Sequence, residues 1–200
     1  MKFWTIQTIQ CYEYLLDKGS ICGDKSFIDS DFLHSYHWLM QKMDARIGKR
    51  PSPDCFPVWA WSQYEGAKKK KPDLRSIALL PKGTKGVRIE INKNENEVLL
   101  SDFDLWHYAL NKWFLGKNET EGIAFDTELN CLEKKGFNVF EFEKLPTNTQ
   151  HKIIESWDKI LDLEFNDPYY TYPKDKKSIQ ATFWTLSIHE IIKVETFVAR

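Results

Sequence analysis

The order of strand-like and helix-like segments is the strongest constraint that this sequence places on its fold. The two kinds of segment do not alternate regularly, so a parallel sheet built from β-α-β units is not expected, and we predict an α+β fold. Runs of aromatic and β-branched residues predict strands at 2–7, 58–61, 74–80, 86–92, 97–100, 137–142, 178–186 and 191–199. Helical spacing of apolar residues predicts helices at 11–19, 28–48, 126–136 and 147–165, with a further helix starting near Ser101.

Length and composition favour a single globular unit. The chain has 200 residues and 42% hydrophobic residues, so we expect one domain over 1–200, with a helical insertion around 117–168. Eight tryptophans are present, and their large rings with a polar N–H are well suited to lining pockets. The net charge of −1 excludes a broad basic coat but allows a local basic groove.

Cysteine usage and hydropathy indicate the compartment. The four cysteines form no C-x-x-C pair, which argues against a zinc ribbon and against a disulfide scaffold. No basic-then-apolar leader and no apolar run of membrane-spanning length is found. We therefore expect a cytoplasmic protein with reduced thiols and no membrane partner.

Residues 101–110, SDFDLWHYAL, combine a helix start with polar groups. Ser101 and Asp104 are spaced like a capping box, and Asp102 and Asp104 suit the positive end of a helix dipole. His107 and Asn111 share a helical face, where they either line a pocket or lie at the surface. A metal site of Asp102, Asp104 and His107 is disfavoured, because positions 102 and 104 of a helix diverge by about 200°.

Polar and aromatic pairs recur on single strand faces. Thr5 and Gln7 point the same way and form either a hydrogen-bonding surface or an exposed edge. Trp59 and Trp61 share a face, with Tyr64 just beyond. They form either a base-stacking surface or an aromatic core.

Two further stretches allow either a functional role or simple exposure to solvent. Gln180 shares a strand face with Thr182 and Trp184, so it either faces solvent or belongs to a site. The four lysines 68–71, near Arg75, either form a solvated loop or hold phosphates. The usual motifs of P-loop, Rossmann, serine-hydrolase and zincin proteins are missing, so those classes lose their support.

Six strings carry a resemblance over nearly the whole chain. In order, WTIQ, VWAW, PDLR, VRIEI, LLSDFDLWH and QATFW resemble an uncharacterised bacterial family. The layout is also similar to small ADP-ribosyltransferase toxins, including those that modify nucleic acids. In these toxins a polar first strand precedes a short helix ending in glycine, aromatic residues flank the nicotinamide, and a late strand carries Glu or Gln. The resemblance implies a split, mostly antiparallel sheet with NAD as the cofactor.

The same resemblance assigns roles to residues. It implies that Thr5 and Gln7 on the first strand and Gln180 on the late strand are catalytic, and it implies no metal ligand. The residues expected to bind NAD are Trp4, Trp59, Trp61, Tyr64, Arg75, Asp102, Trp106 and His107.

The chemistry explains these residue types. Loss of nicotinamide leaves a ribosyl cation, comparable to the oxocarbenium-like state of glycoside hydrolysis, which positioning and electrostatics stabilise. Gln180 departs from the common glutamate because it cannot accept a proton. Either Asp102, Asp104 or Glu190 supplies a carboxylate, or the acceptor needs little activation, or the chain is inactive.

Transfer to a nucleobase nitrogen has less need of a catalytic general base than transfer to a protein. This favours RNA or DNA as the acceptor. We therefore expect an NAD-dependent ADP-ribosyltransferase, acting as a bacterial toxin or phage-defence effector with an antitoxin protein as partner. The alternative is a non-catalytic nucleotide-binding or nucleic-acid-binding module with a Trp-lined cleft.

Overall fold

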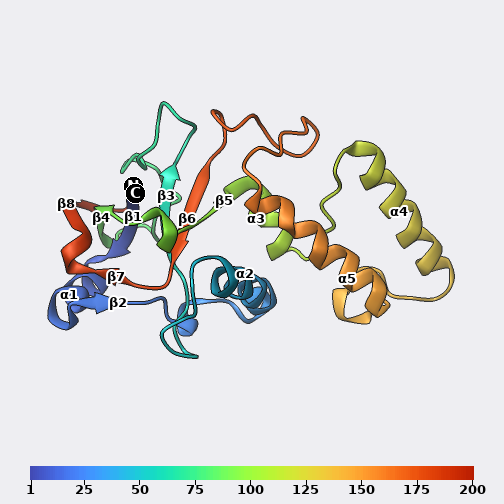
Figure 1. Cartoon of the computed structure of the whole chain (residues 1–200), viewed down its shortest axis with the longest axis horizontal. Coiled ribbons are helices and arrows are strands. Elements are labelled where there is room, and N and C mark those ends of the chain that lie inside the picture. The colour runs from blue at the N-terminus through green and yellow to red at the C-terminus, as the bar shows by residue number, and fades with distance from the viewer.

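A six-stranded sheet with neighbours in the order β5-β6-β3-β1-β4-β8 forms the centre of the fold (Figure 1). The computed structural model describes all residues 1–200, and every strand pairing in it is antiparallel. The α+β, mostly antiparallel architecture predicted from the sequence is therefore confirmed. The sheet strands are β1 (Lys2–Thr8), β3 (Val58–Gln63), β4 (Lys85–Asn92), β5 (Leu99–Asp102), β6 (Ile179–Phe183) and β8 (Ile191–Val198). A separate ribbon pairs β2 (Ser20–Ile21) with β7 (Leu186–Ser187).

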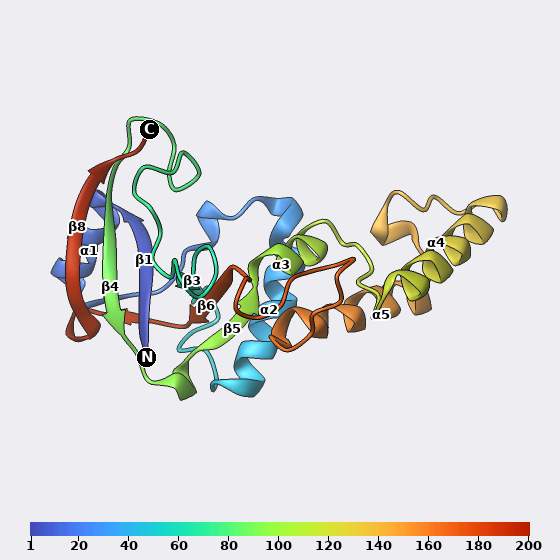
Figure 2. The same cartoon turned by 90° about the horizontal axis from the view of Figure 1, so that it is seen from above.

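The helices divide between the sheet and a lateral extension. They are α1 (Ile9–Lys18), α2 (Leu33–Arg46), α3 (Phe103–Leu110), α4 (Glu119–Lys134) and α5 (Thr147–Ser156). Short 3₁₀ turns lie at Lys25–Phe27, Ser30–Phe32, Glu95–Glu97, Phe142–Lys144, Trp157–Leu161 and Ile188–Glu190. Helices α4 and α5 project from the β5 side of the sheet, at the opposite end of the molecule from β8 (Figure 2). No helix is long and apolar enough to cross a membrane.

Local signals explain where α1 begins and ends. The Thr8 hydroxyl accepts a hydrogen bond from the Cys11 amide at 3.2 Å and caps the first turn. Gly19 ends the helix in the left-handed conformation, with φ of 77°, which a glycine adopts without a steric penalty. The chain then turns back beneath the sheet.

Two hydrophobic cores lie on the two faces of the sheet. Alternate residues of the central strands face α1 and the β2-β7 ribbon, because successive strand residues point to opposite sides. This first core includes Phe3, Leu15, Val58, Ala60, Val87, Ile89, Ile91, Ala181, Phe183 and Leu186. The second core joins α2, α3 and the α4-α5 extension, and includes Trp38, Leu39, Met43, Leu105, Trp106, Leu115, Phe125, Ile153 and Trp157.

Two predicted strands and several helix boundaries were wrong: α2 starts at Leu33 and not at 28, and α5 ends at Ser156 and not at 165. Residues 74–80 form turns with local backbone hydrogen bonds, and residues 137–142 form a turn leading into a 3₁₀ helix. Neither apolar run has a neighbouring strand to pair with. Helix α4 begins at Glu119, earlier than expected, because the Asn118 side chain accepts from the Glu121 amide and caps it.

Replacement of Trp157 tests the packing of the second core most directly. Its side chain is fully buried, lies edge-on to Trp38 at 5.7 Å, and donates from Nε1 to the Trp113 carbonyl at 2.8 Å. We predict that Trp157→Ala lowers the free energy of unfolding by about 3–5 kcal/mol, because it leaves a cavity. Trp113→Ala, which removes a largely exposed ring, should change it by less than about 1 kcal/mol. Urea denaturation measures both, and equal losses would contradict this description of the core.

Candidate functional site

One row of side chains crosses the whole sheet on a single face. Residues that are directly paired on neighbouring strands point to the same side of a sheet. The pairings place Lys193, Glu90, Trp4, Trp61, Gln180 and Ser101 in one continuous row from β8 to β5. We call its central part, Trp4, Trp61, Gln180 and Ser101, the Trp–Gln row. The pairing register of β3 with β6 shifts just beyond Trp61, an irregularity that is common beside functional sites.

Aromatic rings form a wall beside this row. The Trp61 ring lies edge-on to Tyr64 at 4.9 Å and to Phe103 at 5.0 Å. Phe103 in turn contacts the ring of His107 at 4.9 Å, and Trp4 donates from Nε1 to Glu90 at 3.3 Å. Trp4 and Trp61 are only half-buried, so part of each ring is open to a ligand.

Two buried polar atoms in the row have no hydrogen-bond partner. They are Oε1 of Gln180 and Oγ of Ser101, which belong to directly paired residues. A buried polar group left unpaired costs about 1–3 kcal/mol, and native proteins contain few such groups. Gln180 is half-exposed, so rotation of its amide presents Oε1 to a ligand beside the aromatic wall, whereas Ser101 is fully buried and out of a ligand's reach.

Asp102 anchors the β5 end of the row. Its carboxylate caps α3 by accepting from the amides of Asp104 at 2.9 Å and Leu105 at 3.2 Å, so Asp102, and not the predicted Ser101, is the N-cap. Its other oxygen accepts from Thr171 at 2.6 Å and lies 3.1 Å from the Lys177 ammonium. Asp102 and Lys177 are both fully buried. This carboxylate therefore has a structural role, and it is not accessible to a cofactor as the sequence interpretation required.

The neighbouring Asp104 carboxylate is exposed in the first turn of α3. Partial burial raises its pKa above the usual range, and the charge of Asp102 raises it further, whereas His107 and Lys177 lower it. His107 is also exposed, and its Nδ1 hydrogen-bonds to the Phe103 carbonyl at 3.0 Å. Because α3 begins at Phe103, Asp102 and Asp104 diverge, and no group of three His, Cys, Asp or Glu residues is placed to hold a metal ion.

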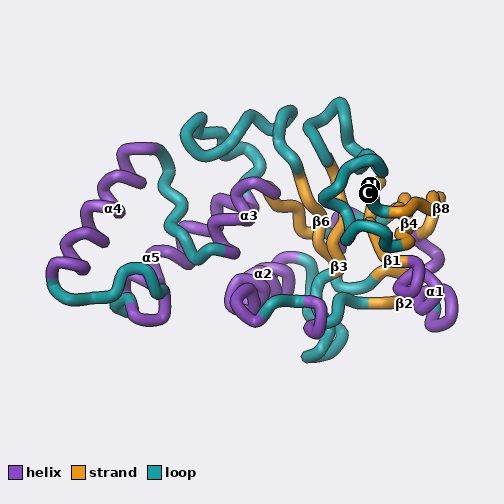
Figure 3. The backbone as a smooth tube through the Cα atoms, turned by 180° about the vertical axis from the view of Figure 1, so that it is seen from behind, coloured by secondary structure: helices purple, strands orange, loops and turns teal.

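A basic hollow lies on the same sheet face as the row. Arg88 pairs with Ile6, two residues from Trp4, and the loop after Tyr64 folds over it to enclose a cavity of about 630 Å³. Figure 3 shows this loop at the same end of β3 and β6 as the loop that precedes β6. The two loops are joined where the Ala67 amide donates to the Asp175 carbonyl at 2.8 Å.

The hollow contains cations without acidic partners. Arg88 is buried and donates hydrogen bonds to the Pro72 carbonyl and, at 2.5 Å, to the Glu195 carboxylate. This bond lowers the pKa of Glu195 to about 2. The Nε atom of Arg88 has no hydrogen-bond partner. Arg75 is paired with Asp73 at 2.6 Å, whereas three lysines of the loop form no ion pair and can bind an anion. These are Lys68, Lys70 and Lys71.

The structure separates the predicted catalytic residues. Thr5 and Gln7 point to the face that bears the first core, where Thr5 is fully buried and donates to the Trp59 carbonyl at 2.7 Å. Gln7 donates to the Thr5 hydroxyl at 2.8 Å. Gln180 belongs to the opposite face, and β3 lies between β1 and β6. The alternation of strand side chains therefore keeps Gln7 and Gln180 out of a common site.

Two predicted cofactor-binding tryptophans belong to the second core. The Trp59 and Trp106 rings lie 5.4 Å apart, and Trp106 stacks on Trp38 at 6.3 Å. Trp106 is buried, and Trp59 packs against the same cluster beneath α2 and α3. Of the predicted cofactor-binding residues, the structure brings Trp4, Trp61, Tyr64 and His107 to the aromatic wall and Arg75 to the basic hollow.

A protein-family model described as "Domain of unknown function (DUF3841)" matches residues 2–192, which include the entire Trp–Gln row. The chain belongs to this DUF3841 family. No curated protein and no solved structure matches it.

The Asp102–Lys177 pair should be energetically coupled. We predict that Lys177→Met lowers the free energy of unfolding by about 3–5 kcal/mol, because it leaves the buried Asp102 carboxylate without a positively charged partner. Adding Asp102→Asn removes that charge but keeps an oxygen for the cap, so the double variant should be more stable than Lys177→Met alone. Chemical denaturation of both variants and of Asp102→Asn gives the coupling energy. Additive effects would contradict a direct ion pair.

Proposed function

We propose that the DUF3841 chain binds a nucleotide on the Trp–Gln row, with the base held by Gln180. The unpartnered Oε1 of Gln180 is the observation that carries this proposal. A glutamine amide recognises adenine by accepting from N6–H and donating to N7. The carboxamide of nicotinamide offers the same pair of groups, so both ends of NAD fit this chemistry.

The aromatic wall supplies the second part of base recognition. Trp61 is paired directly with Gln180, and Trp4 is paired with Trp61 on the next strand, so a flat base beside the Gln180 amide can stack on their half-exposed rings. Stacking of a base on an aromatic side chain contributes about 1–3 kcal/mol and tolerates every base. The amide of Gln180 would then supply the selectivity.

The basic hollow supplies the phosphate-binding part. Lys68, Lys70, Lys71 and the buried Arg88 lie on the same sheet face as the row. Lysines of this kind neutralise phosphates without reading sequence, and such binding weakens as salt increases. The arrangement suits a dinucleotide such as NAD and also a short stretch of single-stranded RNA or DNA, in which a base and its backbone are bound together.

ADP-ribosyl transfer from NAD is a second candidate, favoured by Asp104. Of the three carboxylates considered for this role, Asp102 is buried in an ion pair and Glu190 is bound to Lys93 at 2.5 Å. Asp104 is exposed in the first turn of α3, next in sequence to Phe103 of the aromatic wall, and its raised pKa suits a proton acceptor. Thr5 and Gln7 take no part, so Gln180 would orient the nicotinamide. This candidate includes a role as a cytoplasmic toxin or phage-defence effector, a split ADP-ribosyltransferase-like sheet, RNA or DNA as the acceptor, and an antitoxin protein as partner.

Calorimetry with AMP, NAD and a short oligo-deoxyadenylate tests the binding proposal. We predict that Gln180→Ala weakens binding about tenfold or more, because it removes both hydrogen bonds to the base. Gln7→Ala is the matched control, since it removes the same side chain from the opposite face of the sheet. Loss of binding in Gln7→Ala but not in Gln180→Ala, or no binding to the wild-type protein, would contradict the proposal.

Release of nicotinamide from labelled NAD distinguishes the two candidates. Release that Gln180→Ala and Asp104→Asn both abolish supports the transferase, and transfer of label to RNA, DNA or protein then identifies the acceptor. Binding without release supports the non-catalytic module.

A further inference from the structure

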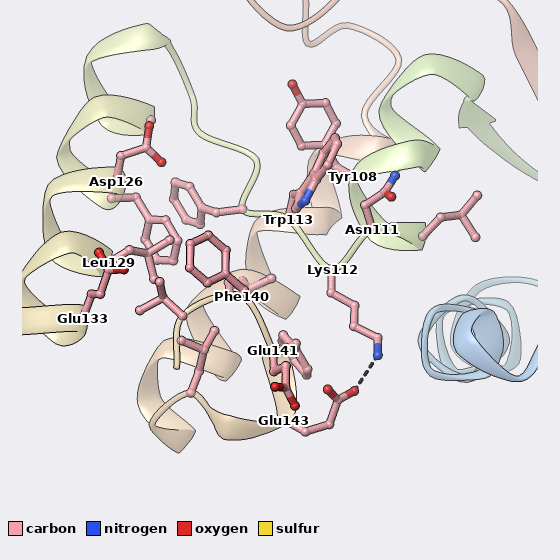
Figure 4. A pocket seen from close by; sticks show the side chains of 18 of the residues that line it. Tyr108, Asn111, Lys112, Trp113, Asp126, Leu129, Glu133, Phe140, Glu141 and Glu143 are labelled. Carbon is pink, nitrogen blue, oxygen red and sulfur yellow. Dashed lines mark hydrogen bonds and ion pairs between the residues drawn. The ribbon is translucent and has the colours of Figure 1, made fainter. Parts of the chain in front are cut away.

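A second cavity lies away from the Trp–Gln row and from the basic hollow. It encloses about 880 Å³ between α4, the segment that follows α3, and the turn that carries Phe140 (Figure 4). Most of its lining residues are hydrophobic. It therefore offers an apolar binding surface that the proposed nucleotide site does not use.

Helix α4 forms one wall of this cavity and is only weakly covered. Among its 16 residues only Phe125 is buried, where it stacks on Phe114 at 4.1 Å. A surface helix normally packs a whole apolar stripe against the rest of the protein. Trp113 is 56% exposed and Phe140 is 88% exposed at the cavity. Large apolar side chains gathered around one groove are typical of an interaction site.

The rim of the cavity is acidic. Five carboxylates line it, against the single cation Lys112: Asp31, Asp126, Glu133, Glu141 and Glu143. Lys112 is bound to Glu143 at 2.5 Å, and Glu141 is bound to Lys144 at 2.8 Å.

The remaining carboxylates, Asp31, Asp126 and Glu133, form no ion pair. Asp126 and Glu133 lie along the α4 wall of the cavity (Figure 4). Asn130 also lines the cavity, and its spacing puts it on the same helical face, so the three residues make a polar stripe.

We infer that this cavity binds a basic amphipathic segment of a partner protein. Apolar side chains of the segment would contact the aromatic floor, while its lysines or arginines would pair with Asp126 and Glu133. An arginine could also stack on the exposed Trp113 ring. Helix α4 is about 24 Å long, enough to contact a helical segment of similar length. The acidic rim repels phosphates, so this surface does not suit nucleic acid.

Fluorescence anisotropy of the full-length protein with designed peptides tests this inference. The probe is a labelled peptide of about 16 residues, matching α4, with leucine and lysine at helical spacing. The control peptide has glutamate in place of lysine. We predict that the lysine peptide binds, that binding weakens as salt increases, and that the glutamate peptide does not bind.

Matched variants locate the binding to the cavity. Asp126→Asn/Glu133→Gln and, separately, Phe140→Ser should each weaken lysine-peptide binding about tenfold or more. Glu13→Gln/Asp17→Asn removes two exposed carboxylates from α1 and should leave it unchanged within about twofold. Thermal melting followed by circular dichroism checks that every variant is folded. Phe140 is almost fully exposed, so its replacement should leave the fold intact.

Several results would overturn the inference. They are no binding of the lysine peptide, equal binding of both peptides, or binding that the cavity variants leave unchanged. Sedimentation velocity examines the other possible occupant. If the wild-type protein self-associates and Phe140→Ser abolishes this, the cavity binds a second copy of the chain and not a basic partner. Each result is independent of nucleotide binding at the Trp–Gln row.

Discussion

The carboxylate of Asp102 has no contact with water, so its charge must be neutralised where it lies. The Lys177 ammonium, the Thr171 hydroxyl and two amides of α3 do this together. Asp102 ends β5 and Lys177 lies just before β6, so the ion pair fixes the ends of the two strands that carry Ser101 and Gln180. The start of α3, and with it Phe103 beside Trp61, depends on the same carboxylate.

Strand alternation then gives the sheet two faces with different tasks. On β1, Phe3 and Thr5 are buried in the first core, whereas Trp4 faces the row. A net charge of −1 conceals a further asymmetry, because cations gather in the hollow around Arg88 and carboxylates gather around the α4 cavity. The molecule therefore carries a cationic surface in the hollow and an acidic surface at the α4 cavity.

Short-range patterns were enough to predict most elements of the fold. The strands around Trp4, Trp61 and Gln180 were expected close to where they occur, because alternation of side chains is a local property of the sequence. The same reasoning failed at 74–80 and 137–142, since an apolar run becomes a strand only when another strand lies beside it.

The site itself depended on information that the local sequence does not contain. Thr5 and Gln7 share a face as expected, but pairing through β3 places Gln180 on the opposite face, which the local sequence does not reveal. Trp59 and Trp61 also share a face, yet Trp59 packs against Tyr36 of α2 and Trp106 of α3 in the second core, whereas Trp61 contacts Phe103 at the start of α3. The sequence indicates only a helix-capping role for Ser101, because its position beside Gln180 follows from the β5–β6 register.

The most direct measurement is a crystal structure of the protein soaked with AMP. The account predicts a purine ring stacked against Trp61 or Trp4, with its exocyclic amine within hydrogen-bonding distance of Gln180 Oε1 and its phosphate toward Arg88. A nucleotide bound beside Gln7, or one bound on the row with Gln180 Oε1 still unpartnered, would contradict it.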